Sequence, residues 1–337
     1  MKVIIDNKIP FIAGRLERAG VDTVYADPKA ISPEMVKDAD ALIVRTRTRC
    51  DEALLKGSAV RLVVTATIGT DHIDIPWCEA NGIAVRNCAG CNAPGVAQYV
   101  WSSLLRLGLR PGAKVGVVGF GHVGSIVAEW GRGMGFDIRV CDPPRQKAGM
   151  ADNDYRPLAE LLRECDAVTL HTPLTRTGDD ATYHLVGAEE LAEMRPGSVL
   201  VNSSRGPVVD NQAWAEELEK GNKRGVVDVW EGEPAISRSL LADAAIATPH
   251  IAGYSLQGKQ RATRMALEAF AEFFGMEVDT AGLCGAYRSP GDEFPEDAAQ
   301  RIVDSYDPFT DTARLRACPG DFERQRGDYD YRSEPTL

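Results

Sequence analysis

Three residues in the second half of the sequence have side chains suited to the chemistry of a hydroxy acid. Arg205 lies in the motif VNSSRG, Glu233 in EGEP and His250 in TPHIAGY. An arginine binds a carboxylate through two parallel hydrogen bonds. A histidine accepts or releases a proton near neutral pH, and a neighbouring carboxylate orients it and stabilises its charged form. These groups could therefore bind an acid and move a proton at its hydroxyl-bearing carbon.

A glycine-rich turn predicts where a hydride carrier would bind. An apolar strand at 115–118 leads into the segment GFGHVG, and a helix follows. In such a turn one glycine makes the bend, one lets the pyrophosphate approach, and one lets the helix pack on the strand. The helix N-terminus adds free N–H groups for the phosphates. The turn residues expected at the cofactor are Gly119, Gly121, His122, Val123 and Gly124.

An acidic residue at the end of the next strand distinguishes a dinucleotide site from a purely structural turn. Asp142 has this position. A carboxylate there binds the two ribose hydroxyls and repels a ribose phosphate, so it favours NAD over NADP. Arg145 is an opposing signal, because an arginine nearby can accept that phosphate. The sequence predicts NAD as the cofactor.

Two series of alternating strands and helices must position these residues. Strands are expected at 2–6, 41–45, 62–65, 114–118, 138–141, 167–170, 198–201, 225–229 and 245–248. Helices are expected at 11–19, 33–37, 96–107 and 262–276. Such alternation is typical of parallel βαβ units. The fold class is therefore α/β, with two doubly wound parallel sheets.

Composition excludes several other kinds of protein. The 337 residues are enough for two or three domains, and they carry a net charge of −11, which argues against nucleic-acid binding. No apolar run reaches the length of about 18 residues that a membrane span needs, and the first residues lack the features of a signal peptide. The eight cysteines are scattered, which favours the cytoplasm, and their spacing predicts no metal site. Cys88 and Cys91 form a lone CxxC pair, whose alternative interpretation is a redox site.

Several motifs together resemble those of the D-isomer-specific 2-hydroxyacid dehydrogenases. Within that family the chain is most similar to members that oxidise 4-phospho-D-erythronate in pyridoxal phosphate (vitamin B6) synthesis. The motifs that carry the resemblance are DNKIP at 6–10, ALIVRT at 41–46, TATIGTDHID at 65–74, GCNA at 90–93, DPPR at 142–145, DVWEGEP at 228–234 and HIAGY at 250–254.

The resemblance implies a domain organisation. Residues 1–93 and 257–280 would form a flavodoxin-like substrate domain, and residues 94–256 a Rossmann NAD domain. Residues 281–337 would be a short C-terminal tail related to a dimerisation segment. A homodimer is expected, because family members also pair through their nucleotide domains and the long helix at 96–107.

The resemblance also assigns roles within the catalytic trio. Arg205 would bind the C1 carboxylate and polarise the C2 oxygen, and His250 would remove the C2 hydroxyl proton. Glu233 would hydrogen-bond the imidazole. Glu231 is the local competitor for this last role, but the family places its acid directly before a proline, so Glu231 is interpreted as a solvated charge.

Further contacts follow from the same resemblance. Outside the glycine turn, the residues expected at the cofactor are Asp142, Thr172, Ser203, Ser204, Arg205, Asp228 and Gly253. The substrate would contact Thr46 and Thr67 from the first domain and Tyr254 from the second. Polar contacts from both domains would imply closure, which excludes water during hydride transfer.

The segment RTRTR at 45–49 suggests phosphate recognition on chemical grounds. If the strand continued, alternate residues would share a face. Arginines suit a phosphate dianion because of their bidentate geometry. Arg45 or Arg47 is therefore the candidate phosphate ligand, and a solvated charged loop is the alternative.

Two other functions remain open from the sequence. One is the same reaction on another small acid, such as 3-phosphoglycerate or glycerate. The other is an NAD-sensing interaction protein resembling a corepressor, against which the intact trio argues.

Overall fold

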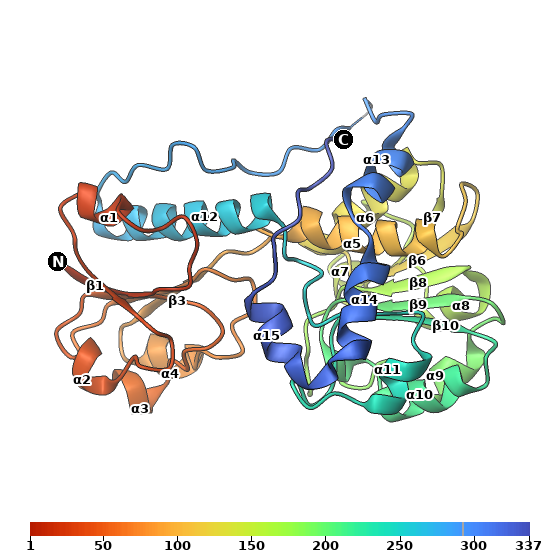
Figure 1. Ribbon diagram of the computed structural model, residues 1–337, viewed down its shortest axis with the longest axis horizontal. Helices are drawn as coiled ribbons and strands as arrows, with labels where there is room; N and C mark the ends of the chain where they lie inside the picture. Colours follow the sequence, from red (N-terminus) through yellow and green to blue (C-terminus); the bar gives the residue numbers. More distant parts are fainter. Residues whose placement is uncertain (292) are drawn as a thin grey trace. The chain divides into compact units, whose positions relative to one another are not determined.

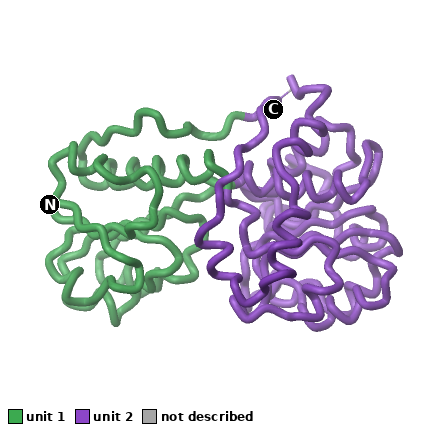
Figure 2. Tube along the Cα trace, in the orientation of Figure 1, with its two compact units in different colours: residues 1–92, 255–288 green, residues 93–254, 289–337 purple. Residues whose placement is uncertain are grey.

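The chain forms two compact units, as seen in a computed structural model that describes residues 1–291 and 293–337. The first unit comprises residues 1–92 and 255–288, and the second comprises residues 93–254 and 289–337 (Figure 2). The segment at 281–337, expected to be a tail, is therefore divided between the two units. Among the described residues, no helix has the length and apolar character needed to cross a membrane.

The first unit contains a five-stranded parallel sheet in the order β2-β1-β3-β4-β5, which is the flavodoxin-like order. Its strands are β1 (Lys2–Asp6), β2 (Asp22–Ala26), β3 (Ala41–Val44), β4 (Leu62–Thr65) and β5 (Ala84–Asn87). Its helices are α1 (Arg15–Arg18), α2 (Pro33–Val36), α3 (Glu52–Leu55), α4 (Ile75–Ala80) and α12 (Leu256–Phe274).

Both faces of this sheet are buried, because neighbouring residues of a strand point to opposite faces. Ile5 and Ile43 belong to a core that includes Phe270 of α12. Ile4 and Leu42 belong to the core on the opposite face. This burial on both faces explains why the central strands are continuous apolar runs.

The second unit contains a six-stranded parallel sheet in the order β11-β10-β9-β8-β6-β7. Its strands are β6 (Lys114–Val118), β7 (Asp137–Cys141), β8 (Ala167–Leu170), β9 (Val199–Asn202), β10 (Arg224–Val227) and β11 (Ile246–Ala247). An isolated parallel bridge joins Tyr155 to Val140 of β7. Counting this bridge as a reduced strand gives the strand order of a dinucleotide-binding sheet. The expected α/β class with two parallel sheets is thus confirmed.

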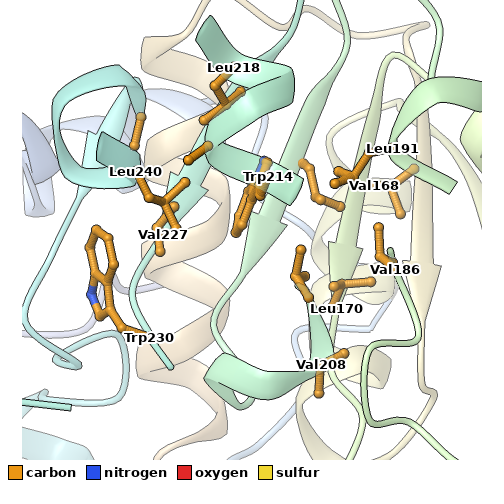
Figure 3. Packing of buried hydrophobic residues seen from close by; sticks show 14 of the residues in the cluster. Val168, Leu170, Val186, Leu191, Val208, Trp214, Leu218, Val227, Trp230 and Leu240 are labelled. Atoms are coloured by element: carbon orange, nitrogen blue, oxygen red, sulfur yellow. The ribbon is translucent and has the colours of Figure 1, made fainter. Parts of the chain in front are cut away.

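Helices cover both faces of this second sheet (Figure 1). They are α5 (Ala93–Arg106), α6 (His122–Gly133), α7 (Pro143–Lys147), α8 (Leu158–Glu164), α9 (Ala188–Glu193), the 3-10 turn η1 (Gly206–Val208), α10 (Asn211–Glu219) and α11 (Arg238–Asp243). Helices α9, α10 and α11 lie on the face opposite α5 and α6. Figure 3 shows Trp214 of α10 at the centre of the core on the α10 side, with Trp230 and Leu170 also in that core.

The C-terminal segment of the second unit is helical. It contains α13 (Ala298–Ser305), α14 (Pro308–Ala317), the 3-10 turn η2 (Pro319–Asp321) and α15 (Phe322–Gly327). It packs on α5, where Ser102 Oγ donates to the carbonyl of Tyr306 at 2.6 Å and the Gln98 side-chain amide donates to the carbonyl of Ser333 at 2.7 Å. Every α5 residue from Ala93 to Leu105 is buried within the chain. The chain's own C-terminal segment thus covers part of the helix that was expected to pair two subunits, and the pairing itself stays a prediction.

Two strands and several boundaries differ from the expectation. Strands β2 and β5 lie at the two edges of the first sheet, and their exposed or half-buried positions carry residues such as Asp22, Tyr25 and Arg86 instead of a continuous apolar run. Their pattern therefore lacks the signal of a central strand. Helix α12 begins several residues earlier than expected, where the Ser255 hydroxyl accepts a hydrogen bond from the N–H of Gly258 and caps the helix.

Candidate active site

Three neighbouring strands of the second unit bring the catalytic trio to one edge of the sheet. Arg205 follows β9, Glu233 follows β10 and His250 follows β11. These strands are adjacent and parallel, so the residues after them meet at the carboxyl edge. In open α/β sheets ligands bind at that edge.

His250 and Glu233 form a direct pair. His250 Nδ1 lies 2.8 Å from Glu233 Oε2 and 3.1 Å from Oε1. Since a carboxylate only accepts, Nδ1 carries the proton and donates it. The carboxylate also accepts a hydrogen bond from the N–H of Trp230 at 2.9 Å. This arrangement fixes the imidazole and leaves Nε2 as the nitrogen for a reacting group.

Burial and hydrogen bonding shift the pKa of Glu233 in opposite directions. Burial would raise the pKa of Glu233, but the hydrogen bond and charge of His250, with smaller contributions from Trp230 and Arg326, lower it below its ordinary value. Glu233 is therefore ionised at neutral pH. An ionised partner favours the protonated imidazolium that a histidine base becomes.

The backbone at His250 is held in a conformation that L-residues seldom adopt. Its φ is 57°, and its N–H donates to the carbonyl of Asp228 at 2.8 Å. Asp228 is buried, and its side chain accepts from Thr248 Oγ1 and Ile251 N, both at 2.7 Å, and from Ala252 N at 3.0 Å. Burial raises the pKa of Asp228, although His250 and these hydrogen bonds oppose the shift. Asp228 thus holds the loop on either side of the histidine.

The loops that carry Arg205 and Glu233 touch through their backbones. A Cβ at Gly206 would lie 2.1 Å from the carbonyl carbon and oxygen of Trp230, so only glycine fits. Arg205 Nη1 donates to the carbonyl of Ser204 at 2.8 Å, and Asn202 donates to the carbonyl of Arg205 at 2.9 Å. Ser204 is itself fixed, because its N–H and hydroxyl both donate to Asn202.

The glycine turn between β6 and α6 has the features of a phosphate cradle. Gly119 has a φ of 88°, which makes the bend. A Cβ at Gly124 would lie 1.9 Å from the carbonyl oxygen of Gly119, so the helix could not approach the turn. A Cβ at Gly121 would meet nothing within 4 Å, so this glycine keeps space open at the N-terminus of α6, beside His122 and Val123. Each glycine has one of the three expected roles.

Two hydroxyl groups expected at the cofactor have no hydrogen-bond partner in the part of the chain that the structure describes. Thr172 Oγ1 and Ser203 Oγ are buried, and neither makes a hydrogen bond among the described residues. Thr172 lies against the turn, since its methyl group would be 3.1 Å from a Cβ at Gly119. Buried polar atoms are nearly always hydrogen-bonded in native structures. These atoms therefore fit a polar ligand such as a dinucleotide.

The residues around the ribose position favour NAD. Asp142 accepts from the N–H of Phe120 at 2.7 Å and from the N–H of Arg145 at 3.0 Å, which ties the carboxylate to the glycine turn. Arg145 Nη2 donates to Asp152 at 2.6 Å and Nε donates to the Tyr155 hydroxyl at 3.1 Å. The opposing signal from Arg145 is thus weakened, because this guanidinium already has a carboxylate partner.

The C-terminal segment adds an arginine that the motifs did not indicate. Arg326 of α15 donates from Nε to the Tyr254 hydroxyl at 3.2 Å, and its guanidinium lies 6.0 Å from the centre of that ring. Gly253, next to Tyr254, is half-buried in the same loop. Arginines are frequent between residues 314 and 326, so spacing alone could not single out Arg326.

In the first unit, the structure changes the interpretation of the RTRTR segment. Strand β3 ends at Val44 and the chain turns, so alternate residues do not share a face. Arg45 donates to the buried Asp6 from Nε at 2.9 Å and from Nη2 at 3.3 Å. This pairing favours Arg47 over Arg45 as the phosphate ligand, because one side of the Arg45 guanidinium neutralises a buried carboxylate. Arg47 is exposed and stays a candidate.

The two threonines assigned to the substrate also belong to the first unit. Thr46 is exposed, directly after β3. Thr67 follows β4, and its hydroxyl lies 2.7 Å from that of the buried Thr65. Their contact with substrate stays a prediction.

Glu231 is not a solvated charge, contrary to expectation. Its Oε1 lies 2.8 Å from His184 Nε2 and its Oε2 accepts from the N–H of Asn211 at 3.1 Å. Asp210 completes a group whose possible metal-ligand atoms lie within 4.8 Å of one another. Within this cluster His184 hydrogen-bonds to Glu231, and its Nδ1 lies 3.6 Å from Asp210 Oδ2.

Burial shifts the pKa values of His171, which directly follows β8, and of Cys88 in the CxxC pair. Burial lowers the pKa of His171 to about 3, so this residue is unsuited to proton transfer near neutral pH. Cys88 and Cys91 are buried free thiols, and burial raises the pKa of Cys88. A thiol with a raised pKa is a poor nucleophile, which disfavours the redox interpretation.

Comparisons with known proteins agree with this geometry. Residues 96–252 match the family model of the D-isomer specific 2-hydroxyacid dehydrogenase, NAD binding domain. The chain is 42% identical to erythronate-4-phosphate dehydrogenase of Bacteroides fragilis, over 99% of this chain and 97% of that protein. It is also 42% identical to the enzyme of that name from Azotobacter vinelandii, over 98% and 90% of the two chains. The NAD-bound structure of 3-phosphoglycerate dehydrogenase from Entamoeba histolytica is 26% identical, with a TM-score of 0.69, and the match covers 86% of this chain and 99% of that one.

The fold and the site define an NAD-dependent dehydrogenase of 2-hydroxy acids. Within that class, the chain belongs to the erythronate-4-phosphate dehydrogenase family. The resemblance inferred from the motifs is thus confirmed.

Proposed function

We propose that this protein oxidises 4-phospho-D-erythronate with NAD, forming (R)-3-hydroxy-2-oxo-4-phosphooxybutanoate in the synthesis of pyridoxal phosphate. The names of its relatives support this substrate. The observation that carries the chemistry is the pair of His250 Nδ1 and the Glu233 carboxylate at 2.8 Å, positioned after adjacent strands with Arg205.

Each residue of the trio has its own task in the reaction at C2. Arg205 binds the C1 carboxylate and polarises the C2 oxygen. His250 Nε2 accepts the C2 hydroxyl proton as the C–H bond breaks and the C=O bond forms. Glu233 holds the ring through Nδ1 and stabilises the imidazolium. In the reverse direction the same nitrogen returns the proton.

NAD, when bound, accepts the hydride that leaves C2. The N-terminus of α6, with Gly121, His122 and Val123, would hold its pyrophosphate. Asp142 would accept hydrogen bonds from the ribose hydroxyls. The remaining cofactor contacts that we propose are Gly119, Gly124, Thr172, Ser203, Ser204, Arg205, Asp228 and Gly253.

Substrate recognition beyond the reacting carbon is assigned to other residues. Thr46, Thr67 and Tyr254 would contact the acid, as the family resemblance suggests. Arg47 is the proposed phosphate ligand from the first unit, since its neighbour Arg45 is paired with Asp6.

The test is NADH formation with purified protein across four acids. The panel is 4-phosphoerythronate, erythronate, 3-phosphoglycerate and glycerate. We expect the highest kcat/KM with 4-phosphoerythronate. Preference for a non-phosphorylated acid, or for 3-phosphoglycerate, would reject this substrate assignment while keeping the class of reaction.

A variant separates catalysis from cofactor sensing. His250→Ala should lose turnover with every acid yet bind NADH with unchanged affinity, measured by titration of protein fluorescence. Loss of NADH binding together with turnover would show that His250 maintains the fold instead of moving a proton. Unchanged turnover would favour a different base.

We also propose a homodimer in the cytoplasm. The eight cysteines among the described residues are free thiols, as expected for a reducing compartment. Because the tail covers α5, the pairing surface would lie elsewhere on the chain. Light scattering coupled to size-exclusion chromatography tests this, and a monomeric mass would contradict it.

A further inference from the structure

A buried arginine close to the C-terminal end of the sequence reaches the loop that carries the catalytic histidine. Arg332 follows α15 in the second unit, and only 9% of the residue is exposed. Nothing in the proposed reaction uses it. Its side chain is nevertheless the most extensively hydrogen-bonded cation of the C-terminal segment among the described residues.

The guanidinium of Arg332 donates to three backbone carbonyls of the loop that follows His250. Nη1 donates to the carbonyl of Ile251 at 3.0 Å and of Tyr254 at 3.4 Å, and Nη2 donates to the carbonyl of Ala252. Nη2 also donates to the carbonyl of Gly95 at 3.0 Å. The planar guanidinium can satisfy this many acceptors because its donors form a rigid fork.

Three further contacts fix the guanidinium itself. Nε donates to Gln98 Oε1 at 3.0 Å, and the guanidinium carbon lies 4.3 Å from the centre of the Tyr306 ring. The Tyr329 hydroxyl lies 3.4 Å from Nη1 and also donates to Asp311. A buried cation persists only where hydrogen bonds and opposite charge compensate its desolvation.

Asp228 binds the backbone of the same two residues through their other polar groups. It accepts hydrogen bonds from the N–H groups of Ile251 and Ala252, whereas Arg332 donates to the carbonyl oxygens of both. A buried carboxylate and a buried guanidinium therefore hold the two residues that follow His250. The left-handed backbone of His250 is strained, and such strain persists only when the surroundings impose it.

We propose that Arg332 is a positioning residue for catalysis, which fixes the loop from His250 to Tyr254 so that the imidazole meets both Glu233 and the substrate hydroxyl. The proposal rests on the function proposed for His250. It gives the C-terminal segment a role in the chemistry in addition to covering α5.

Two variants of Arg332 and one matched control test the proposal in the full chain. Arg332→Gln removes the charge and most donors, and Arg332→Lys keeps the charge but not the fork. The control is Arg324→Gln in α15, whose side chain is 70% exposed and pairs only with Asp321 in the described structure.

The expected result is a loss of kcat much larger than the change in cofactor binding. Displacement of a catalytic group by an ångström costs about 100-fold in rate, so we expect a fall of that order for Arg332→Gln and a smaller one for Arg332→Lys. The NADH dissociation constant should rise far less than kcat falls, because Arg332 holds the loop of Gly253 but does not contact the glycine turn proposed for the pyrophosphate. Guanidinium ion at millimolar concentration should restore part of the kcat of Arg332→Gln but not change that of Arg324→Gln.

A readout that needs no substrate keeps this test separate from the substrate assignment. The chain has five histidines, so labelled imidazole signals can be resolved by NMR and assigned with His250→Ala. In Arg332→Gln the His250 signal should move, while those of His72 and His122 stay in place. An unmoved His250 signal, or a parallel loss of kcat, NADH binding and all native imidazole signals, would overturn the positioning role.

Discussion

Glu231 and Glu233, separated by a single glycine, accept hydrogen bonds from two different histidines. Glu233 pairs with His250 and Glu231 with His184, each at 2.8 Å. Glu231 also accepts the N–H of Asn211 at the start of α10, so it ties the loop to the body of the second unit. Glu231 thus anchors the loop, and Glu233 is the carboxylate that we propose takes part in catalysis.

Replacement of each glutamate by glutamine should separate these roles. Glu233→Gln keeps an acceptor for Nδ1 but loses the charge that stabilises imidazolium, so kcat should fall about 100-fold or more. Glu231→Gln should retain most of its turnover and lose about 1–2 kcal/mol of unfolding free energy. Steady-state kinetics and urea unfolding measure the two effects. A similar loss of kcat in both variants would contradict the assignment.

The pH dependence of stability should report the ionised state of Glu233. Its pKa in the folded chain is below the ordinary value, so the carboxylate contributes stability above about pH 4.5, and this contribution is lost as the pH falls through the lower folded pKa. The difference in unfolding free energy between the wild type and Glu233→Gln should therefore be greatest near neutral pH and shrink in acid. A difference that is constant with pH would show that the charge does not stabilise the fold.

Two alanine substitutions in the glycine turn should differ in effect: one should lower stability and the other should lower NADH affinity. Gly124→Ala places a Cβ against the Gly119 carbonyl, so it should lower stability by a few kcal/mol, about 2–4, as overpacking and strain do. Gly121→Ala meets no atom within 4 Å, so its thermal unfolding should match the wild type. Its methyl group would occupy the space proposed for the pyrophosphate, and NADH affinity should fall about tenfold. Unchanged affinity in Gly121→Ala would place the pyrophosphate elsewhere.

Arg45 and Arg47, two of the three arginines of the RTRTR segment, should likewise have contrasting effects on stability and on substrate binding. Arg45→Ala leaves the fully buried Asp6 without its cation, which should cost about 3–5 kcal/mol of unfolding free energy. Arg47→Ala should cost much less, because this side chain is exposed. If Arg47 binds the phosphate, its loss should raise KM for 4-phosphoerythronate more than for erythronate. An equal effect on the two acids would remove Arg47 from phosphate recognition.

The residues that sequence reasoning placed best are those whose chemistry depends on local order along the chain. The glycine turn requires a strand, three glycines and a helix in direct succession, and β6, Gly119 to Gly124 and α6 follow that order. The grouping of the catalytic trio could be predicted because each member follows a strand. Neighbouring parallel strands have their carboxyl ends at the same edge of the sheet.

Residues whose role depends on distant partners could not be predicted in this way. Arg45 looked available until the fold placed it against Asp6, which is far away in sequence. Glu231 looked solvated because its partner His184 lies on another loop. Arg326 and Arg332 carry no motif, and only the packing of the C-terminal helices brings them to Tyr254 and to the loop after His250.

The late position of the C-terminal segment in the sequence affects how the chain can fold during its synthesis. The second unit begins at Ala93, but the residues that cover α5 and hold the histidine loop are made after all the strands of its sheet. The first unit is likewise interrupted, since its helix α12 follows the whole second sheet in sequence. Domains generally fold as units while they emerge from the ribosome. In this chain neither unit can be completed until late in synthesis, so the side of α5 that carries Gln98 and Ser102 stays uncovered until the C-terminal residues are made.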